Sequence, residues 1–127
     1  MHSIYFRPDA AGVLFSPMDE EPMGPCDASP DDVVIAGGLE RLGHLAPNLV
    51  PRTLRQRWAG LRTFSPDRVP VVGEDPQLPG FFWLAGQGGC GIETSPAMGQ
   101  IAADLLMMGK TEHFDQRLLA PTRFGAA

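Results

Sequence analysis

The sequence predicts an α+β fold: a mostly antiparallel sheet with a covering helix, followed by a strand, a glycine-rich loop and a second helix. Three observations lead to this fold class. Short apolar runs bounded by Pro, Gly and Asp, typical of strands joined by turns, recur along the 127-residue chain. Two segments carry helix start signals followed by apolar residues at helical spacing. The sequence GQGGCG separates the last apolar run from the second of these helices.

The first two apolar runs predict a β-hairpin, Ser3–Arg7 with Gly12–Ser16. Pro8 and Asp9, directly after the first run, supply the turn chemistry. A helix is then expected to start with Ser29 as its N-cap and Pro30 at its first position. It should end near residue 45, before the sequence APN.

Extended structure is predicted for residues 53–65, 69–74 and 78–86, with a turn at Pro66 and Asp67. The second helix is expected to start at Thr94 or Ser95, with Pro96 at its first position, and to stop at Gly109. Its apolar face would comprise Met98, Ile101, Ala102, Leu105 and Met108. The remaining tail predicts a short helix or irregular packing.

Composition excludes some classes of protein. The net charge is −5 and the ten basic residues are scattered, so nucleic-acid binding is not predicted. No apolar stretch approaches the roughly 18 residues of a membrane span, and no secretory signal is recognisable. We therefore expect a cytoplasmic protein without a membrane span. The two cysteines and three histidines are dispersed along the chain and predict no metal site.

The sequence GQGGCG, residues 86–91, matches the pattern G-x-G-x-x-G of dinucleotide-binding folds. That interpretation requires a helix that opens at the loop and an acidic residue about 20 positions later, at the end of a second strand. Here the helix is expected to begin past the last glycine, and no apolar run precedes the acidic residues that follow. Two readings remain: backbone N–H groups that stabilise negative charge beside a flat ring, or a tight connection without a ligand.

Two longer segments, RWAGLRTFSPDRVPVVG and GFFWLAGQGGCGIETSPAMGQIAADLL, resemble the C-terminal region of FAD-dependent amino-acid and amine oxidoreductases. These form the D-amino-acid oxidase superfamily, with its glycine oxidase and sarcosine oxidase-like members. The resemblance implies a substrate-binding subdomain portion in residues 1–80 and a segment of the FAD domain in residues 81–127. No N-terminal dinucleotide-binding unit precedes Met1, so we expect a truncated form, the C-terminal portion of such an enzyme.

The resemblance also implies roles for individual residues. The backbones of the loop would lie beside the flavin ring, at Gly88, Gly89, Cys90, Gly91 and Ile92. Arg62 would bind the substrate carboxylate, a task suited to a planar guanidinium, and Tyr5 would assist through its hydroxyl. No side chain is implied as a catalytic acid or base. Gly88 and Gly89 leave the loop without a second basic side chain, and Glu93 stands where sarcosine oxidase-like loops have a lysine.

The implied function is oxidation of an amino acid or secondary amine to an imine, by hydride transfer to FAD. Without the dinucleotide-binding unit, this chain alone is expected to be inactive and not to retain the cofactor. Its partners would be the small substrate and a separate FAD-binding chain or a second copy in a homo-oligomer, with Ile101 or Leu105 in the contact. The alternative is a non-catalytic binding or assembly protein that reuses the substrate-domain fold.

Overall fold

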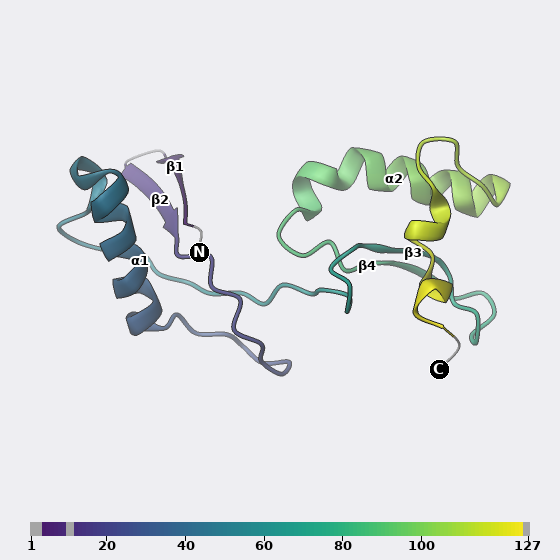
Figure 1. Ribbon diagram of the computed structural model, residues 1–127, viewed down its shortest axis with the longest axis horizontal. Helices are drawn as coiled ribbons and strands as arrows, with labels where there is room; N and C mark the ends of the chain where they lie inside the picture. The colour runs from purple at the N-terminus through teal and green to yellow at the C-terminus, as the bar shows by residue number, and fades with distance from the viewer. Residues whose placement is uncertain (1–3, 10–11, 126–127) are drawn as a thin grey trace. The chain divides into compact units, whose positions relative to one another are not determined.

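The computed structural model describes residues 4–9 and 12–125, which fall into two compact units, Met1–Leu61 and Arg62–Ala127 (Figure 1). Each unit contains one two-stranded antiparallel sheet and one α-helix. The α+β class and the antiparallel character of the sheets are therefore confirmed. The assignment of residues 1–80 and 81–127 to two functional parts stays a prediction.

The predicted hairpin is present in the first unit, with β1 (Tyr5–Asp9) paired to β2 (Gly12–Ser16). β1 continues through Pro8 and Asp9, so their placement in the turn is wrong. Proline is tolerated here because both strands of a two-stranded sheet are edges. The predicted start at Ser3 lies outside the described residues.

Helix α1 (Asp32–Leu45) ends where the sequence predicts but begins later than expected. Its N-cap is Asp31, whose carboxylate accepts the N–H groups of Val33 at 2.7 Å and Val34 at 3.1 Å. The expected cap at Ser29 is therefore wrong, because a carboxylate two residues closer to the helix satisfies the free N–H groups.

A glycine allows α1 to pack closely on the hairpin of its own unit. A Cβ atom at Gly38 would lie 2.7 Å from the ring of Phe15 and 2.8 Å from Pro17. Glycine weakens a helix, but here it permits the approach that buries Leu42, which is 1% exposed.

In the second unit, β3 (Val71–Glu74) pairs with β4 (Phe82–Ala85). The sheet lies beside helix α2 (Gly91–Met108), as Figure 1 shows. The core between them is small and apolar: Val72, Met98, Ile101, Ala102 and Leu119. Two 3₁₀ turns, η2 (Gln116–Leu118) and η3 (Pro121–Phe124), form the tail, which agrees with the predicted short or irregular packing.

The strand expected over residues 53–65 is absent, and this prediction is wrong. Residues 53–63 have no regular secondary structure and are exposed. Only Phe64 forms a bridge, with Gln87. A strand needs a neighbour that continues beside it, and here the pairing partner is a single residue of the glycine loop.

Helix α2 ends at Gly109 as predicted, with a left-handed φ of 69° at that residue, but it starts at Gly91. The hydroxyls of Thr94 and Ser95, which were expected to cap its N-terminus, instead donate to backbone carbonyls earlier in the chain. Thr94 donates to the Cys90 carbonyl at 2.7 Å, and Ser95 donates to the Ile92 carbonyl at 2.8 Å. Pro96 has no N–H for the Ile92 carbonyl, so the Ser95 hydroxyl takes over that bond and the helix passes through the proline.

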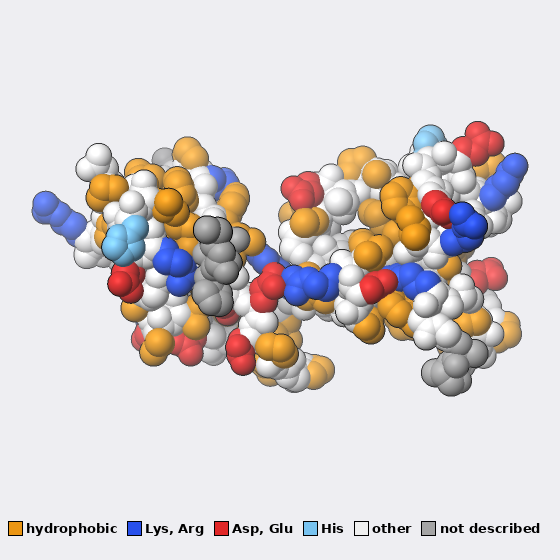
Figure 2. All heavy atoms as spheres, in the orientation of Figure 1, with side chains coloured by type: hydrophobic (Ala, Val, Ile, Leu, Met, Phe, Trp, Pro, Cys, Tyr) orange, Lys and Arg blue, Asp and Glu red, His pale blue; other side chains and the backbone are white. Residues whose placement is uncertain are grey.

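The expected contact of Ile101 or Leu105 with a partner chain stays a prediction, and of these two residues only Leu105 is partly accessible. Ile101 is 5% exposed, and both residues pack on the core of their own unit, so α2 covers its own sheet. Large hydrophobic side chains nevertheless remain exposed in both units (Figure 2). On α2 these are Ile92, Leu106, Met107 and Met108. In the described part of the chain, neither α-helix combines the length and apolarity needed to cross a bilayer.

Candidate functional site

The glycine loop, residues 86–91, joins β4 directly to α2. Gly86 and Gly88 have φ angles of 76° and 55°, in the left-handed region that favours glycine. The Gly88 N–H donates to the Thr63 carbonyl at 3.1 Å, and the Cys90 N–H donates to the Gln87 carbonyl at 3.0 Å. The loop is therefore a defined turn, anchored to the segment that precedes β3.

Arg62 lies against this loop. A Cβ atom at Gly89 would be 3.0 Å from Nη1 and 3.2 Å from Cζ of the Arg62 guanidinium. Arg62 is exposed, and no carboxylate of the described residues forms an ion pair with it. The structure thus brings together the predicted carboxylate ligand and the predicted flavin loop, which are 27 positions apart at Arg62 and Gly89.

The N-terminus of α2 adds a second source of positive potential. Its N-cap, Cys90, makes no side-chain capping bond, so the first-turn N–H groups lack a side-chain acceptor. The helix dipole favours negative charge at this end. Uncapped N–H donors beside an exposed guanidinium fit an anionic or carbonyl-bearing group.

The Glu93 carboxylate opposes the positive potential of the helix N-terminus at Cys90. A hydrogen bond with Glu93 and the charge of that carboxylate raise the pKa of the Cys90 thiol, while the Arg62 charge acts in the opposite direction. The thiol is therefore neutral near pH 7, which fits a structural role and not that of a nucleophile.

The site residues fall in different units. Arg62 and Gly88 to Ile92 belong to the second unit, and Ile92 is 94% exposed. Tyr5 lies on β1 of the first unit, opposite Ser16, and is 44% exposed. Its part in carboxylate binding stays a prediction.

One argument against a dinucleotide loop is wrong, because α2 does open at Gly91, within the loop. The other argument holds: in the described residues after α2 only the 3₁₀ turns follow, without the second strand that such a unit requires. The loop therefore has the helix-terminus geometry of an anion site without the topology of a nucleotide-binding βαβ unit.

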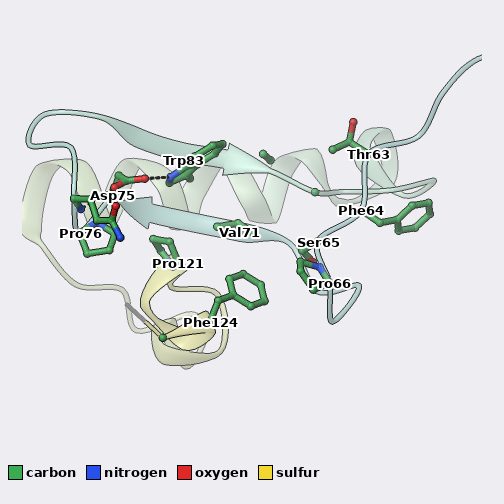
Figure 3. Close-up of a pocket in the computed structure, with 14 residues that line it drawn as sticks. Thr63, Phe64, Ser65, Pro66, Val71, Asp75, Pro76, Trp83, Pro121 and Phe124 are labelled. Carbon is green, nitrogen blue, oxygen red and sulfur yellow. Dashed lines mark hydrogen bonds between the residues drawn. The ribbon is translucent and has the colours of Figure 1, made fainter. Parts of the chain in front are cut away.

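Sequence reasoning missed a groove of about 400 Å³ that begins at the base of the loop (Figure 3). Phe64 and Trp83 lie toward its opposite ends. The Trp83 indole N–H donates to the Asp75 carboxylate at 2.8 Å and lowers the pKa of that carboxyl. Other apolar lining residues are Pro66, Val71, Pro121 and Phe124. They come from three separate segments, so no local pattern signals the groove.

A family model described as FAD dependent oxidoreductase matches residues 1–105. Since the match covers most of the chain, this protein belongs to the FAD-dependent oxidoreductase family typified by D-amino-acid oxidases. The cofactor of this family is FAD, and the resemblance noted from the loop and the Arg62 segment is confirmed.

Individual relatives agree with this family assignment. Glycine oxidase of Geobacillus kaustophilus is 37% identical over 97 residues, which cover 73% of this chain and 26% of the relative. The tRNA 5-methylaminomethyl-2-thiouridine biosynthesis bifunctional protein MnmC of Thiobacillus denitrificans is 31% identical over 130 residues, covering 94% and 21%. Hydrogen cyanide synthase subunit HcnC of Pseudomonas aeruginosa is 32% identical over 90 residues, covering 71% and 21%. The chain spans about a quarter of the length of these relatives.

Proposed function

We propose that this chain forms the substrate-facing and flavin-facing part of an FAD-dependent oxidoreductase that oxidises an amino acid or secondary amine to an imine. The observation that carries the proposal is the position of the Arg62 guanidinium against Gly89, beside the N-terminus of α2. One relative is named for glycine and another for a methylaminomethyl group. Both names are consistent with an amine substrate.

The loop backbone would hold the cofactor ring. Gly88, Gly89, Cys90, Gly91 and Ile92 would present N–H groups and the positive end of α2 to the pyrimidine edge of the flavin, where these donors stabilise developing negative charge. When bound, FAD supplies the two-electron oxidation of the amine. The side chains of this chain then bind and orient the substrate, and none of them is required as a general base if the amine binds neutral.

Arg62 would bind the substrate carboxylate. A guanidinium without an ion-pair partner among the described residues is available for two parallel charge-assisted hydrogen bonds. Such a fork fixes the plane of the carboxylate, and so the orientation of the α-carbon next to it. The Tyr5 hydroxyl would assist, which requires its strand to lie near Arg62 in the assembled enzyme.

The chain matches only 21% to 26% of the length of three relatives, so residues outside these 127 would complete the site. We propose a separate FAD-binding chain or a second copy as the partner. We expect the assembly to be cytoplasmic. The exposed apolar side chains and the open groove of the second unit support a need for such a partner.

The Arg62→Ala variant tests the carboxylate role in the FAD-loaded assembly. Loss of a bidentate charge-assisted pair typically costs about 2–4 kcal/mol. The KM for a carboxylate-bearing amine should therefore rise strongly, while the KM for its decarboxylated analogue should change little. Steady-state kinetics on the two substrates measure the difference.

Arg55→Ala is the matched control, because it removes an exposed arginine from the irregular segment outside the site. It should leave both KM values unchanged. Equal effects of Arg62→Ala on the two amines would remove Arg62 from carboxylate binding.

A non-catalytic binding or assembly role is the second candidate, and the exposed large hydrophobic side chains of both units are compatible with it. A flavin absorption spectrum distinguishes the two candidates. The enzyme proposal requires flavin to bind when the FAD-binding chain is present and not to the chain alone. Absence of flavin in every assembly that contains this chain would favour the binding role.

A further inference from the structure

We propose that Phe64 is a positioning residue whose ring holds the glycine loop so that Gly89 faces the Arg62 guanidinium. This inference rests on the proposed function, because it explains how the carboxylate ligand is directed to the flavin loop. It concerns a side chain that the loop motif does not include, and it follows from the packing at Gly88.

The Phe64 ring occupies the space that a side chain at position 88 would need. A Cβ atom at Gly88 would lie 2.3, 2.9 and 3.0 Å from three carbon atoms of this ring. The backbone at Gly88 also has a φ of 55°. The glycine is therefore required twice, once for its backbone angle and once for the ring that packs against it.

The pairing around the ring sets the register between two segments. The Gly88 N–H donates to the Thr63 carbonyl at 3.1 Å, and Phe64 forms an antiparallel bridge with Gln87. In this register Arg62 falls beside Gly89. A slip of one residue would turn the Arg62 side chain to the other face of the segment.

The ring is itself held from another side. The guanidinium carbon of Arg68 lies 4.4 Å from the centroid of the Phe64 ring, a cation–π contact. Phe64 remains 37% exposed, and Arg68 and the loop at Gly88 cover parts of its ring. Fixed between Arg68 and Gly88, the ring is the packing element that links the Arg62 segment to the loop.

Amide exchange and side-chain NMR on the full chain test the proposal. In Phe64→Ala the Gly88 amide should lose its protection by about tenfold or more, and the Arg62 Nε–H resonance should move. Phe64→Tyr keeps the ring and should restore both signals. Phe124→Ala removes another half-exposed ring from the same groove and should change neither. Unchanged Gly88 and Arg62 signals in Phe64→Ala would overturn the proposal.

A double-mutant cycle gives an independent test. Gly88→Ala should lower the denaturant midpoint strongly, and adding Phe64→Ala should recover part of the loss, because the clash disappears. Gly86→Ala is the matched control: its φ of 76° gives comparable strain, but its Cβ would meet only ordinary contacts of 3.5 Å or more. It should not be rescued by Phe64→Ala. If Gly88→Ala lowers the denaturant midpoint equally in the wild type and in Phe64→Ala, the steric argument is contradicted.

These measurements use neither flavin nor substrate, so they fail separately from the proposed function. Arg62→Ala could raise the KM of both amines equally while the exchange and unfolding results for Phe64 are as expected. In that case the loop geometry is supported, and Arg62 is not the carboxylate ligand. In the FAD-loaded assembly, Phe64→Ala should raise the KM for the carboxylate-bearing amine more than for its analogue. If Arg62→Ala discriminates between the two amines, equal changes for both amines in Phe64→Ala would overturn the positioning role.

Discussion

The side chain of Arg123 makes five hydrogen bonds, three of which tie the tail to residues 67–69 at the Pro66–Asp67 turn. Its Nε donates to Asp67 at 2.7 Å and its Nη2 to the same carboxylate at 3.0 Å. Further bonds reach the carbonyls of Val69, Leu119 and Ala120. The side chain is 12% exposed, so these bonds satisfy a largely buried guanidinium.

We predict that stability depends on pH through Asp67. The hydrogen bond from Arg123 holds the pKa of the Asp67 carboxyl well below its ordinary value. A group whose pKa is lower in the folded state stabilises fully above its unfolded pKa of about 4, and the effect is lost as the pH falls toward the folded value. The difference in unfolding free energy between the wild type and Asp67→Asn should therefore be largest near pH 7 and shrink below pH 4.

Urea unfolding at pH 7 and near pH 2.5 measures this difference. Asp115→Asn is the comparison, because Asp115 pairs with Arg117 locally, with 86% of the Arg117 side chain exposed. That substitution should have a small effect at either pH. If the difference in unfolding free energy between the wild type and Asp67→Asn stays constant on acidification, ionisation of Asp67 is not the cause of that difference.

At the scale of elements, two glycines in and next to α2 have opposite roles. Gly109 follows the last helical residue with a φ of 69°, while Gly99 lies inside the helix with open space where a Cβ atom would be. Gly109→Ala should lower the free energy of unfolding by about 1 kcal/mol because of the left-handed backbone. Gly99→Ala should raise it by about 0.5–1 kcal/mol.

Thermal and urea unfolding of the two variants measure these changes, and each variant is the control for the other. Neither new methyl group meets an atom within 4 Å, so the backbone alone produces the difference. If Gly109→Ala and Gly99→Ala change the free energy of unfolding in the same direction, α2 does not end at a left-handed Gly109.

Helix ends show what the sequence could predict and where it could not. The end of α2 was predictable because Gly109 follows a periodic apolar pattern. Its start was not, because Thr94 and Ser95 look like caps but donate to carbonyls of the preceding turn. At α1 the cause is different: the Asp31 carboxylate accepts the first free N–H groups, so the N-cap is Asp31 and not Ser29. Sequence gives the residue types that suit a cap, and the fold decides which of them meets a free N–H.

The candidate site was predictable in its members but not in its geometry. Arg62 and the loop were identified through family resemblance, yet their contact depends on the register of residues 62–64 beside 87–89, which no periodic pattern encodes. Phe64 was missed because an aromatic residue in an apparent strand indicates core packing and not loop support.

At the scale of the whole molecule, exposed apolar surface distinguishes this chain from an ordinary monomer. Ile92, Leu106, Met107 and Met108 on α2 are 94%, 60%, 83% and 63% exposed. Apolar surface left in water costs about 25 cal/mol per Å², and large contiguous patches mark interaction sites. These four side chains are more accessible to a partner than Ile101 and Leu105 are.

We therefore predict that the 13.7 kDa chain self-associates when no other partner is present. Met107→Glu should shift it toward the monomer in sedimentation velocity, because it places a charge on the exposed face. Ala59→Glu adds the same charge at an exposed position outside α2 and should leave the distribution unchanged. A monomer at high micromolar concentration, insensitive to both substitutions, would argue against association through this face.

The irregular segment that precedes Arg62 also determines where a protease reaches the backbone. Residues 53–63 are exposed and unpaired in any sheet or helix, the condition that favours nicking. Arg52, Arg55, Arg57 and Arg62 are tryptic sites in or beside it. Cleavage after any of the first three leaves the hairpin with Tyr5 on one fragment, and Arg62, Phe64 and the glycine loop together on the other. Cleavage after Arg62 instead separates this side chain from the loop that it contacts.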